Sequence, residues 1–315
     1  CWYYRYPHAI GERIFCYLKG GNSCYALNGE NQYHSIFGGC RIADPPCIQA
    51  CRGTIQIAAY LSRIRTGDLR DAAGILLTNN PLPAVTGRVC PHWCEQECNR
   101  KDHDQPVSIR GVERYLGDYI LEHAPEIMSP PEKETGKRVA VVGSGPAGLS
   151  AAYYLRMAGH QVTVFDKMPE AGGMLAYGIP AYRLPKDIVR KAVAGIERTG
   201  VQFKMNVDVG RDTSVVSLRK DFDALFLAAG LWEQRDIGLD GEALPKSGLE
   251  FLINTNRGHR ELPGKKVLVI GGGNVAVDVG ITALRLGAGE VTLACLECRD
   301  EMPAFPSEIE QALEE

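Results

Sequence analysis

Residues 137–166 contain the pattern that most constrains how this chain can fold. Residues 138–142 form a short apolar run rich in β-branched side chains, which predicts a buried parallel strand. The next residues supply Gly143, Gly145 and Gly148, and an Ala- and Leu-rich helix begins among them. In such a turn the first glycine makes the bend, the second lets a pyrophosphate approach the backbone, and the third lets helix pack on strand.

A second apolar run, residues 161–165, ends at Asp166, eighteen residues after Gly148. A carboxylate at the end of this second strand can accept hydrogen bonds from the two hydroxyls of an adenosine ribose. The helix that starts in the glycine turn also offers unpaired N–H groups and a positive dipole end to a pyrophosphate. Together these features predict a dinucleotide-binding βαβ unit rather than a turn without a ligand.

The same pattern recurs near the end of the chain. Residues 266–270 predict a strand, Gly271, Gly273 and Ala276 a glycine-type turn, and residues 277–286 a helix. Residues 290–296 predict a further strand that ends at Glu297. We therefore expect an α/β fold with two nested dinucleotide-binding, Rossmann-like domains. Two such domains suit an enzyme that passes a hydride between a flavin and a nicotinamide.

Cysteine usage indicates a metal centre ahead of these domains. Nine of the eleven cysteines lie in the first 98 residues. Cys47 and Cys51 form one group, and Cys90, Cys94 and Cys98 form another at a spacing of four. Thiolates in such groups bind iron–sulfur clusters. Structural zinc prefers paired CxxC loops, which are absent from this segment, but zinc and free thiols both stay open as alternatives.

The composition narrows the class of partner. A net charge of −3 argues against nucleic acid or an anionic membrane as the main partner. We see no apolar stretch long enough to span a bilayer and no signal peptide, so we expect a cytoplasmic protein, although the chain begins at Cys1 rather than Met. No candidate substrate acid, base or nucleophile emerges, and no catalytic residue is predicted.

The pattern along the chain predicts five segments. Residues 1–36 show no recognisable fold, and residues 37–128 predict an α-helical cysteine domain. A proline-rich polar linker covers residues 129–136. Residues 137–263 predict the first part of one nucleotide domain, and residues 264–315 the N-terminal part of the other.

Glu113 lies inside an apolar helical stripe of the cysteine domain, with Ile109, Leu116 and Ile120. A charge on an apolar face is costly unless it is paired or bound to metal. An ion pair with an arginine and a metal ligand are both open at this point. His92, between two cysteines, is expected to support a cluster rather than to ligate it.

Seven motifs in combination resemble the small-subunit family of NAD(P)H-dependent glutamate synthase. This family includes the flavin subunits of electron-bifurcating transhydrogenases and the N-terminal part of dihydropyrimidine dehydrogenase. The resemblance covers the chain from about residue 42 onward. It rests on PPCIQAC, NNPLPAVTGRVCPHWCEQEC, PVSIRGVERYLGDY, VAVVGSGPAGLSAA, GGMLAYGIPAYRLP, GGGNVAVDVG and EMPAFPSE.

This resemblance implies FAD at the first glycine turn, NAD(P)H at the second, and two [4Fe–4S] clusters in the helical domain. One cluster maps to Cys51, Cys90, Cys94 and Glu113, because relatives use Gln or Glu at the matching helix position. The other maps to Cys47 and Cys98, with Cys40 as a possible third ligand. The residues expected to contact the nucleotides are Gly143, Gly145, Pro146, Ala147, Gly148, Asp166, Lys167, Gly172, Gly173, Gly178, Ile179, Ala229, Gly230, Gly271, Gly273, Asn274, Ala276, Asp278, Glu297 and Arg299.

The chain departs from the family pattern at several places. Gly39 and Ile42 stand where the family usually has cysteines, so the cluster at Cys47 and Cys98 is in question. Arg52 stands where the family usually has a proline directly after the cysteine that matches Cys51. The second nucleotide domain stops early, so either the sequence is incomplete or another chain supplies the rest.

These features predict an electron-input subunit that passes electrons from NAD(P)H through FAD and its clusters to other redox subunits of a larger complex. A bifurcating flavoprotein and a redox-inactive scaffold with structural zinc are the alternatives. NADPH-using relatives place arginines where this chain has Glu297 and Cys298. A carboxylate repels a 2′-phosphate, so we expect NADH to be preferred, although Arg299 is near.

Overall fold

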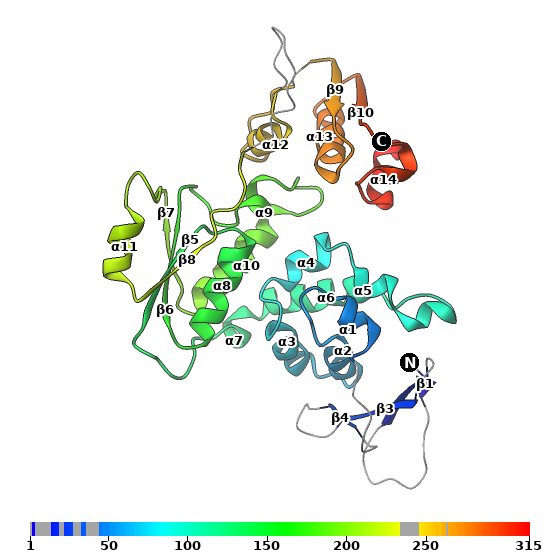
Figure 1. The fold of residues 1–315 in the computed structure, drawn as a ribbon, viewed down its shortest axis with the longest axis vertical. Coiled ribbons are helices and arrows are strands. Elements are labelled where there is room, and N and C mark those ends of the chain that lie inside the picture. Colours follow the sequence, from blue (N-terminus) through cyan, green and yellow to red (C-terminus); the bar gives the residue numbers. More distant parts are fainter. Residues whose placement is uncertain are drawn as a thin grey trace. The chain divides into compact units, whose positions relative to one another are not determined.

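The computed structural model describes residues 44–233, 246–262 and 264–315, and the backbone of four short strands within residues 1–43 (Figure 1). Contacts divide the chain into two compact units, Cys1–Ile120 and Leu121–Glu315. The predicted linker, 129–136, lies inside the second unit. Each unit is described by itself below.

Four short strands lie in the first 43 residues, where the sequence predicted no fold. They are β1 (Trp2–Tyr3), β2 (Ile14–Leu18), β3 (Asn22–Leu27) and β4 (Tyr33–Ser35). Each pairs antiparallel with the next in the order β1-β2-β3-β4. β1 and β4 have only two and three residues, too few to show a period of two, and the sequence pattern also missed the longer β2 and β3.

The cysteine domain consists of short helices. They are α1 (Pro46–Ala50), α2 (Ile57–Arg65), α3 (Leu69–Leu77), α4 (Pro83–Val89), α5 (Trp93–Gln96), η1 (Asn99–Asp102) and α6 (Ile109–Glu122). Asp68 caps α3, as its position suggests, by accepting a hydrogen bond from the N–H of Asp71 at 3.0 Å. The apolar stripe of α3 is buried, and α3 packs on α2.

Two glycines bring α4 and α6 into direct backbone contact. A Cβ at Gly87 would lie 2.5 Å from the Cα of Arg114, and one at Gly117 would lie 2.3 Å from the backbone N of Ala84. Neither position has room for a side chain. A paired ion bridge joins the same helices, because Arg88 donates to both carboxylate oxygens of Asp118 at 2.7 and 2.9 Å. The two helices therefore form one rigid platform.

The second unit begins with α7 (Ala124–Ile127) and contains a parallel sheet with strand order β7-β6-β5-β8. The strands are β5 (Arg138–Val142), β6 (Gln161–Asp166), β7 (Gln202–Met205) and β8 (Ala224–Leu227). The helices are α8 (Pro146–Met157), α9 (Met174–Tyr177), α10 (Lys186–Arg198) and α11 (Val215–Asp221). Figure 1 shows α8 and α10 on one face of this sheet and α11 on the other.

The sheet alternates its side chains between these two helical layers. Val141 is fully buried on the α8 side, close to the position where Gly148 faces the strand. Ala140 and Phe165 pack on the opposite face against Leu218 of α11. Burial on both faces explains why β5 reads as a continuous apolar run.

A second parallel βαβ unit follows. Its elements are α12 (Gly248–Asn256), β9 (Lys266–Ile270), α13 (Asn274–Arg285), β10 (Glu290–Ala294), η2 (Arg299–Glu301) and α14 (Pro306–Glu314). β9 and β10 pair in register, with Val267 opposite Val291. Leu252, Val269 and Val279 form a core between α12, the sheet and α13. This is the predicted repeat of the first nucleotide domain.

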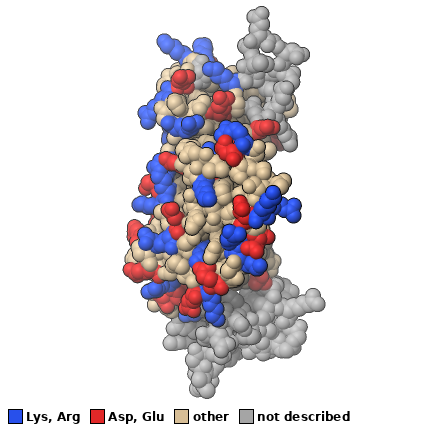
Figure 2. Space-filling view, turned by 90° about the vertical axis from the view of Figure 1, so that its left-hand side faces the viewer, with Lys and Arg blue, Asp and Glu red and all other residues tan. Residues whose placement is uncertain are grey.

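Charged side chains of both signs are interspersed over the described residues on the face shown in Figure 2. This face therefore carries no extended patch of a single sign. Among the described residues, we find no helix with the length and apolar character that a bilayer span requires.

Candidate functional site

The first glycine turn is built so that two of its positions admit only glycine. Gly143 has a φ of 102°, and a Cβ there would lie 2.2 Å from the carbonyl oxygen of Ala228. A Cβ at Gly148 would lie 1.8 Å from the carbonyl oxygen of Gly143. The turn, the start of α8 and the end of β8 thus meet at the carboxyl edge of the sheet, where ligands bind in open α/β folds.

Gly145 differs from these two because its missing side chain leaves open space. A Cβ there would meet only the Cα of Gly173, at 3.9 Å. Gly145 is the N-cap of α8, and Pro146 and Ala147 form the first residues of the helix. A helix N-terminus beside open space suits an anionic group such as a pyrophosphate.

A second glycine segment approaches the same turn. Gly172 and Gly173 have φ values of 129° and 53°. A Cβ on Gly173 would lie 2.6 Å from the Cα of Gly145, so the two backbones nearly touch. The N–H of Gly172 donates to the carbonyl oxygen of Ser144 at 3.0 Å. The structure therefore brings together two segments that the sequence predicted separately as nucleotide contacts.

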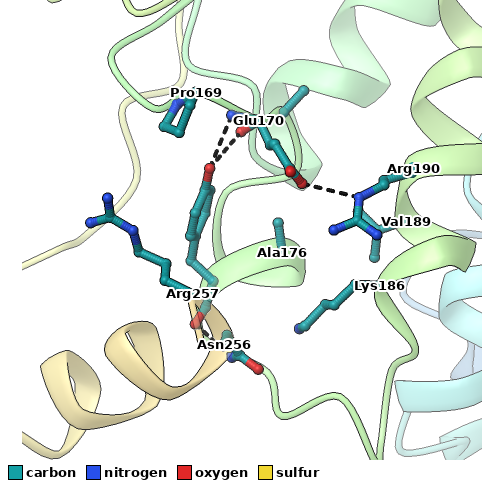
Figure 3. A pocket seen from close by; sticks show the side chains of 10 residues that line it. Pro169, Glu170, Ala176, Lys186, Val189, Arg190, Asn256 and Arg257 are labelled. Carbon is teal, nitrogen blue, oxygen red and sulfur yellow. Dashed lines mark hydrogen bonds and ion pairs between the residues drawn. The ribbon is translucent and has the colours of Figure 1, made fainter. Parts of the chain in front are cut away.

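Two side chains, Lys186 and Asn256, hold the backbone of residues 175–179 through hydrogen bonds (Figure 3). Lys186 donates to the carbonyl oxygens of Leu175 and Ile179, and Asn256 donates to those of Tyr177 and Ile179, at 2.7 and 3.1 Å. Burial, with a smaller contribution from nearby Arg190, lowers the pKa of Lys186 to about 8. These hydrogen bonds fix the backbone on which Gly178 and Ile179 lie.

A cavity of about 270 Å³ lies behind this segment, between the 169–177 loop, α10 and α12 (Figure 3). Its wall includes an ion pair between Arg190 and Glu170 at 3.2 Å. Tyr177 closes the loop by accepting from the N–H of Glu170 at 3.0 Å. We interpret this cavity as the back of the loop rather than as the nucleotide site, because the glycine turn does not line it.

Asp166 is buried and engaged by protein groups. Its Oδ2 accepts from the N–H and the hydroxyl of Ser144 at 2.7 and 2.6 Å, and its Oδ1 accepts from the N–H of Met168 at 2.8 Å. The carboxylate thus ties β6 to the glycine turn. Contact with ribose hydroxyls stays a prediction, and Ser144 is a partner that the sequence pattern did not reveal.

The loop after β8 completes this edge. Ala229 accepts a hydrogen bond from the indole N–H of Trp232 at 3.1 Å, and Gly230 has a φ of 74°. The ammonium of Lys167 lies 5.4 Å from the centre of the Trp232 ring. The predicted contacts Lys167, Ala229 and Gly230 therefore lie close together through this tryptophan.

The second glycine turn is closed by the EMPAFPSE motif. Gly271 has a φ of 136°, and Gly273 is the N-cap of α13. Asn274 accepts from the N–H of Phe305 at 2.9 Å, and the N–H of Ala304 donates to the carbonyl oxygen of Gly272 at 3.0 Å. The motif thus has a structural task that its sequence did not disclose. Ala276 packs into the core of this domain.

Glu297 and Cys295 lie against the same turn. A Cβ at Gly272 would be 3.3 Å from Oε2 of Glu297 and 3.1 Å from Sγ of Cys295. Glu297 therefore lies beside the glycines, as a residue that contacts the adenosine ribose must. Arg299 begins η2 and is exposed.

Asp278 is part of a buried network that the sequence missed. It accepts from the hydroxyl of Tyr182 at 2.8 Å and forms an ion pair with Arg183. Arg183 also pairs with Glu308 of α14 at 2.8 Å. The network joins the GIPAYRLP segment to α13, so Asp278 has a structural role in addition to any contact with a nucleotide. In the sequence, Tyr182 and Arg183 stood inside the GIPAYRLP motif, and no role had been predicted for them.

The thiols of the cysteine domain form two sets by their electrostatic effects on one another. The first set is Cys47 and Cys98, and the second is Cys51, Cys90 and Cys94. Burial and then repulsion from Cys98 raise the pKa of Cys47 to about 11. Burial and then repulsion from Cys51 and Cys90 raise the pKa of Cys94 to about 12. Buried and half-buried thiols that repel one another need a cation before they can ionise, so this donor chemistry fits a metal centre.

Glu113 belongs to the second set, since it acts electrostatically on both Cys90 and Cys94. Its side chain is buried, and its Oε1 accepts from Asn80 at 2.8 Å and from Thr86. Burial raises its pKa, and these two hydrogen bonds act in the opposite direction. Among the described residues, no Lys, Arg or His side chain lies within ion-pair distance of the Glu113 carboxylate, so the ion-pair alternative finds no support. Both hydrogen bonds use Oε1 of Glu113, and neither uses its Oε2.

Two buried polar atoms near these thiols lack a partner within the described part of the chain. They are the hydroxyl of Tyr60 and Nε2 of His92. His92 adopts a left-handed backbone with φ of 58°, and burial, followed by the effect of Arg110, lowers its pKa to about 4. An orphaned hydroxyl, and an orphaned ring nitrogen that donates in one of its two tautomers, are consistent with a bound group that has acceptor atoms. The residues present therefore fit an iron–sulfur cluster.

A single metal ion and a four-iron cluster place different demands on these side chains. In the described ranges, no three His, Cys, Asp or Glu side chains are placed to hold one metal ion. A tetrahedral zinc ion requires its thiolates about 2.3 Å from one centre, whereas each ligand of a four-iron cluster binds a different iron. Cys40 lies outside the described residues. Arg52 stacks on Trp93 at 4.4 Å, which gives this departure from the family pattern a structural task.

Comparison with known proteins gives two family matches. Residues 137–315 match the pyridine nucleotide-disulphide oxidoreductase family. The chain belongs to this family. Residues 39–125 match the model described as dihydropyrimidine dehydrogenase domain II, 4Fe-4S cluster. The predicted α/β fold, the helical iron–sulfur domain ahead of it and the oxidoreductase class are confirmed.

Curated relatives support the resemblance that the motifs indicated. The chain is 41% identical over 279 residues to the NADPH-Fe(3+) oxidoreductase subunit beta of Geobacter sulfurreducens, covering 86% of this chain and 41% of that one. It is 37% identical over 287 residues to the glutamate synthase [NADPH] small chain of Escherichia coli, covering 86% and 61%. The chain thus spans about half the length of these relatives. Both are named as parts of multi-subunit oxidoreductases.

Among solved structures, FprA from Mycobacterium tuberculosis is similar to the nucleotide-binding part. The TM-score is 0.50 at 23% identity, over 57% of this chain and 48% of FprA. At this identity the likeness concerns the fold alone. It agrees with the two nested dinucleotide-binding domains expected from the sequence.

Proposed function

We propose that this chain is the electron-input part of an NAD(P)H oxidoreductase that holds FAD and at least one [4Fe–4S] cluster. The observation that carries the proposal is that one chain combines a glycine-built nucleotide site with a set of buried and half-buried thiols that repel one another. When bound, FAD would supply hydride acceptance from nicotinamide, and the cluster would supply the release of single electrons to a partner.

The residues of the first site would hold FAD. The N-terminus of α8 at Gly145 and Pro146 would face the pyrophosphate, with the Gly172–Gly173 backbone closing the other side. Asp166 would lie at the ribose, oriented by Ser144. Lys186 and Asn256 keep the loop rigid, so the nucleotide meets a preformed surface.

The residues of the helical domain would hold the cluster. Cys51, Cys90 and Cys94 would supply thiolates, and Glu113 would supply an oxygen ligand, presented by its hydrogen bonds to Asn80 and Thr86. Cys47 and Cys98 act on each other electrostatically and would contribute to a second cluster. The partners would be further redox subunits, as the names of the relatives suggest.

The decisive experiment is an anaerobic measurement of flavin, iron and acid-labile sulfide on the intact protein purified with its partners. We expect stoichiometric FAD, four irons and four sulfides for each cluster, and loss of the flavin band on addition of NADH or NADPH. Zinc in place of iron, with no sulfide, would contradict the proposal and favour a structural scaffold. Flavin potentials would then separate simple transfer from bifurcation.

A further inference from the structure

Tyr60 is the best-buried polar side chain of the cysteine domain that has no task in the site described above. It lies on α2, its exposed fraction is 0%, and its hydroxyl has no hydrogen-bond partner among the described residues. Tyrosine hydroxyls normally find a partner when they are buried. Burying this hydroxyl without one costs free energy that a phenylalanine would avoid.

The surroundings of this hydroxyl show which partner would fit. After burial itself, the groups that raise its pKa are Glu113, Cys94, Cys47 and Cys51, in that order. Every one of these is an anionic or thiol group that the proposed function places on a cluster. Within the described part of the chain, the unpartnered hydroxyl of Tyr60 therefore has thiols and a carboxylate as its electrostatic neighbours, and a bound cluster would present sulfur atoms to it.

We propose that the Tyr60 hydroxyl donates a hydrogen bond to a sulfur of the cluster held by Glu113 and its three thiolates, and that this bond raises the reduction potential of the cluster. The inference rests on the proposed function, because it requires that the cluster is present. The physical reason for the direction is charge. Reduction adds a negative charge to the cluster, and a donated hydrogen bond stabilises the more negative state.

This role differs from that of a ligand or a packing residue. The ring of Tyr60 packs in the core, but a phenylalanine would fill the same volume. Only the hydroxyl distinguishes the two, so Tyr60→Phe removes the proposed bond and leaves the ring contacts in place. Tyr115, 56% exposed on α6, offers a matched control in the same domain, because Tyr115→Phe removes a hydroxyl that solvent already satisfies.

The test compares wild-type protein with Tyr60→Phe and Tyr115→Phe, each purified anaerobically with its partners. Iron, sulfide and flavin are measured first, then the midpoint potential of each cluster by EPR-monitored titration. We expect full cluster content in all three proteins. We expect Tyr60→Phe to lower one potential so that the oxidised-to-reduced ratio at a fixed potential rises on the order of tenfold, about 59 mV for one electron.

A second readout detects the bond itself. In electron–nuclear double resonance, the reduced wild-type cluster should couple to a proton that exchanges in D₂O, and this coupling should be missing from Tyr60→Phe but present in Tyr115→Phe. A fully loaded Tyr60→Phe protein with unchanged potentials and unchanged proton couplings overturns the inference alone. A wild-type protein without iron and sulfide overturns the proposed function and the inference with it.

Discussion

A Cβ at Gly148 would lie 1.8 Å from the carbonyl oxygen of Gly143, whereas one at Gly145 would have only the Cα of Gly173 within 4 Å, at 3.9 Å. Gly148 and Gly145, two glycines of one motif, are therefore glycine for different reasons. Gly148 is required by the fold of the free chain. Gly145 has space for a Cβ in the free chain, so we propose that it is glycine because a ligand approaches the backbone there.

This difference predicts opposite outcomes for two substitutions. Gly148→Ala should prevent native folding of the nucleotide domain, because the oxygen it meets belongs to the backbone. Gly145→Val should fold and lower FAD affinity by at least about tenfold, or about 1.4 kcal/mol. Circular dichroism and flavin content after gel filtration measure both. Stoichiometric flavin in Gly145→Val would show that the pyrophosphate lies elsewhere.

Gly117 should be intolerant of a side chain for a related reason. A Cβ there would lie 2.3 Å from a backbone atom of α4. We expect Gly117→Ala to destabilise the cysteine domain by about 1–3 kcal/mol or more. Gly111→Ala on the same helix is the control, because it would meet only the side chain of Ser108, whose hydroxyl can rotate away. Thermal melting and iron retention compare the two, and equal behaviour would disprove the tight α4–α6 contact.

Glu113 should behave as a cluster ligand. We expect Glu113→Ala to weaken cluster retention by at least about tenfold. Glu113→Cys should keep the iron but change the EPR signal, because a thiolate replaces an oxygen. Glu122→Ala, exposed at the end of α6, serves as the control. If both Glu113 variants gave wild-type iron content and spectra, the carboxylate would have no place at the cluster.

Coenzyme choice should depend on Glu297, which lies beside Gly272. Its carboxylate can accept two ribose hydroxyls but repels a 2′-phosphate, so the wild-type protein should reduce its flavin faster with NADH. Glu297→Ala should narrow the preference by roughly tenfold or more, about 1.4 kcal/mol. Arg299→Ala should lower only the residual NADPH rate. The two relatives described above are named for NADPH, so this prediction distinguishes the chain from them. Faster flavin reduction of the wild-type protein by NADPH than by NADH would refute it.

Much of the nucleotide-binding part could be predicted from sequence because its signals are local. The predicted bounds of β5 and β9 coincide with the observed ones. Another strand proved shorter, as β10 covers 290–294 rather than 290–296. Strand ends lack a sharp local signal, because pairing with the neighbouring strand decides where they stop.

The candidate site was only partly accessible in this way. Spacing singled out the two cysteine groups and the charge of Glu113 on an apolar face, and the family resemblance implied that Cys51, Cys90, Cys94 and Glu113 share one cluster. Asn80 and Thr86 did not stand out, because each is an ordinary polar residue until the fold brings it to Glu113. The same holds for Tyr182 and Arg183, which read as part of a motif without a task.

The sequence by itself determined the glycine turns, the strands that feed them and the thiols, because backbone sterics and ligand chemistry act over a few neighbouring residues. Tertiary structure decided which groups meet. Asn80 reaches Glu113 across 33 residues and Arg183 reaches Asp278 across 95. Such pairs arise from the packing of whole helices and loops, as does the orphaned hydroxyl of Tyr60, since no periodicity encodes a contact between segments so far apart in the chain.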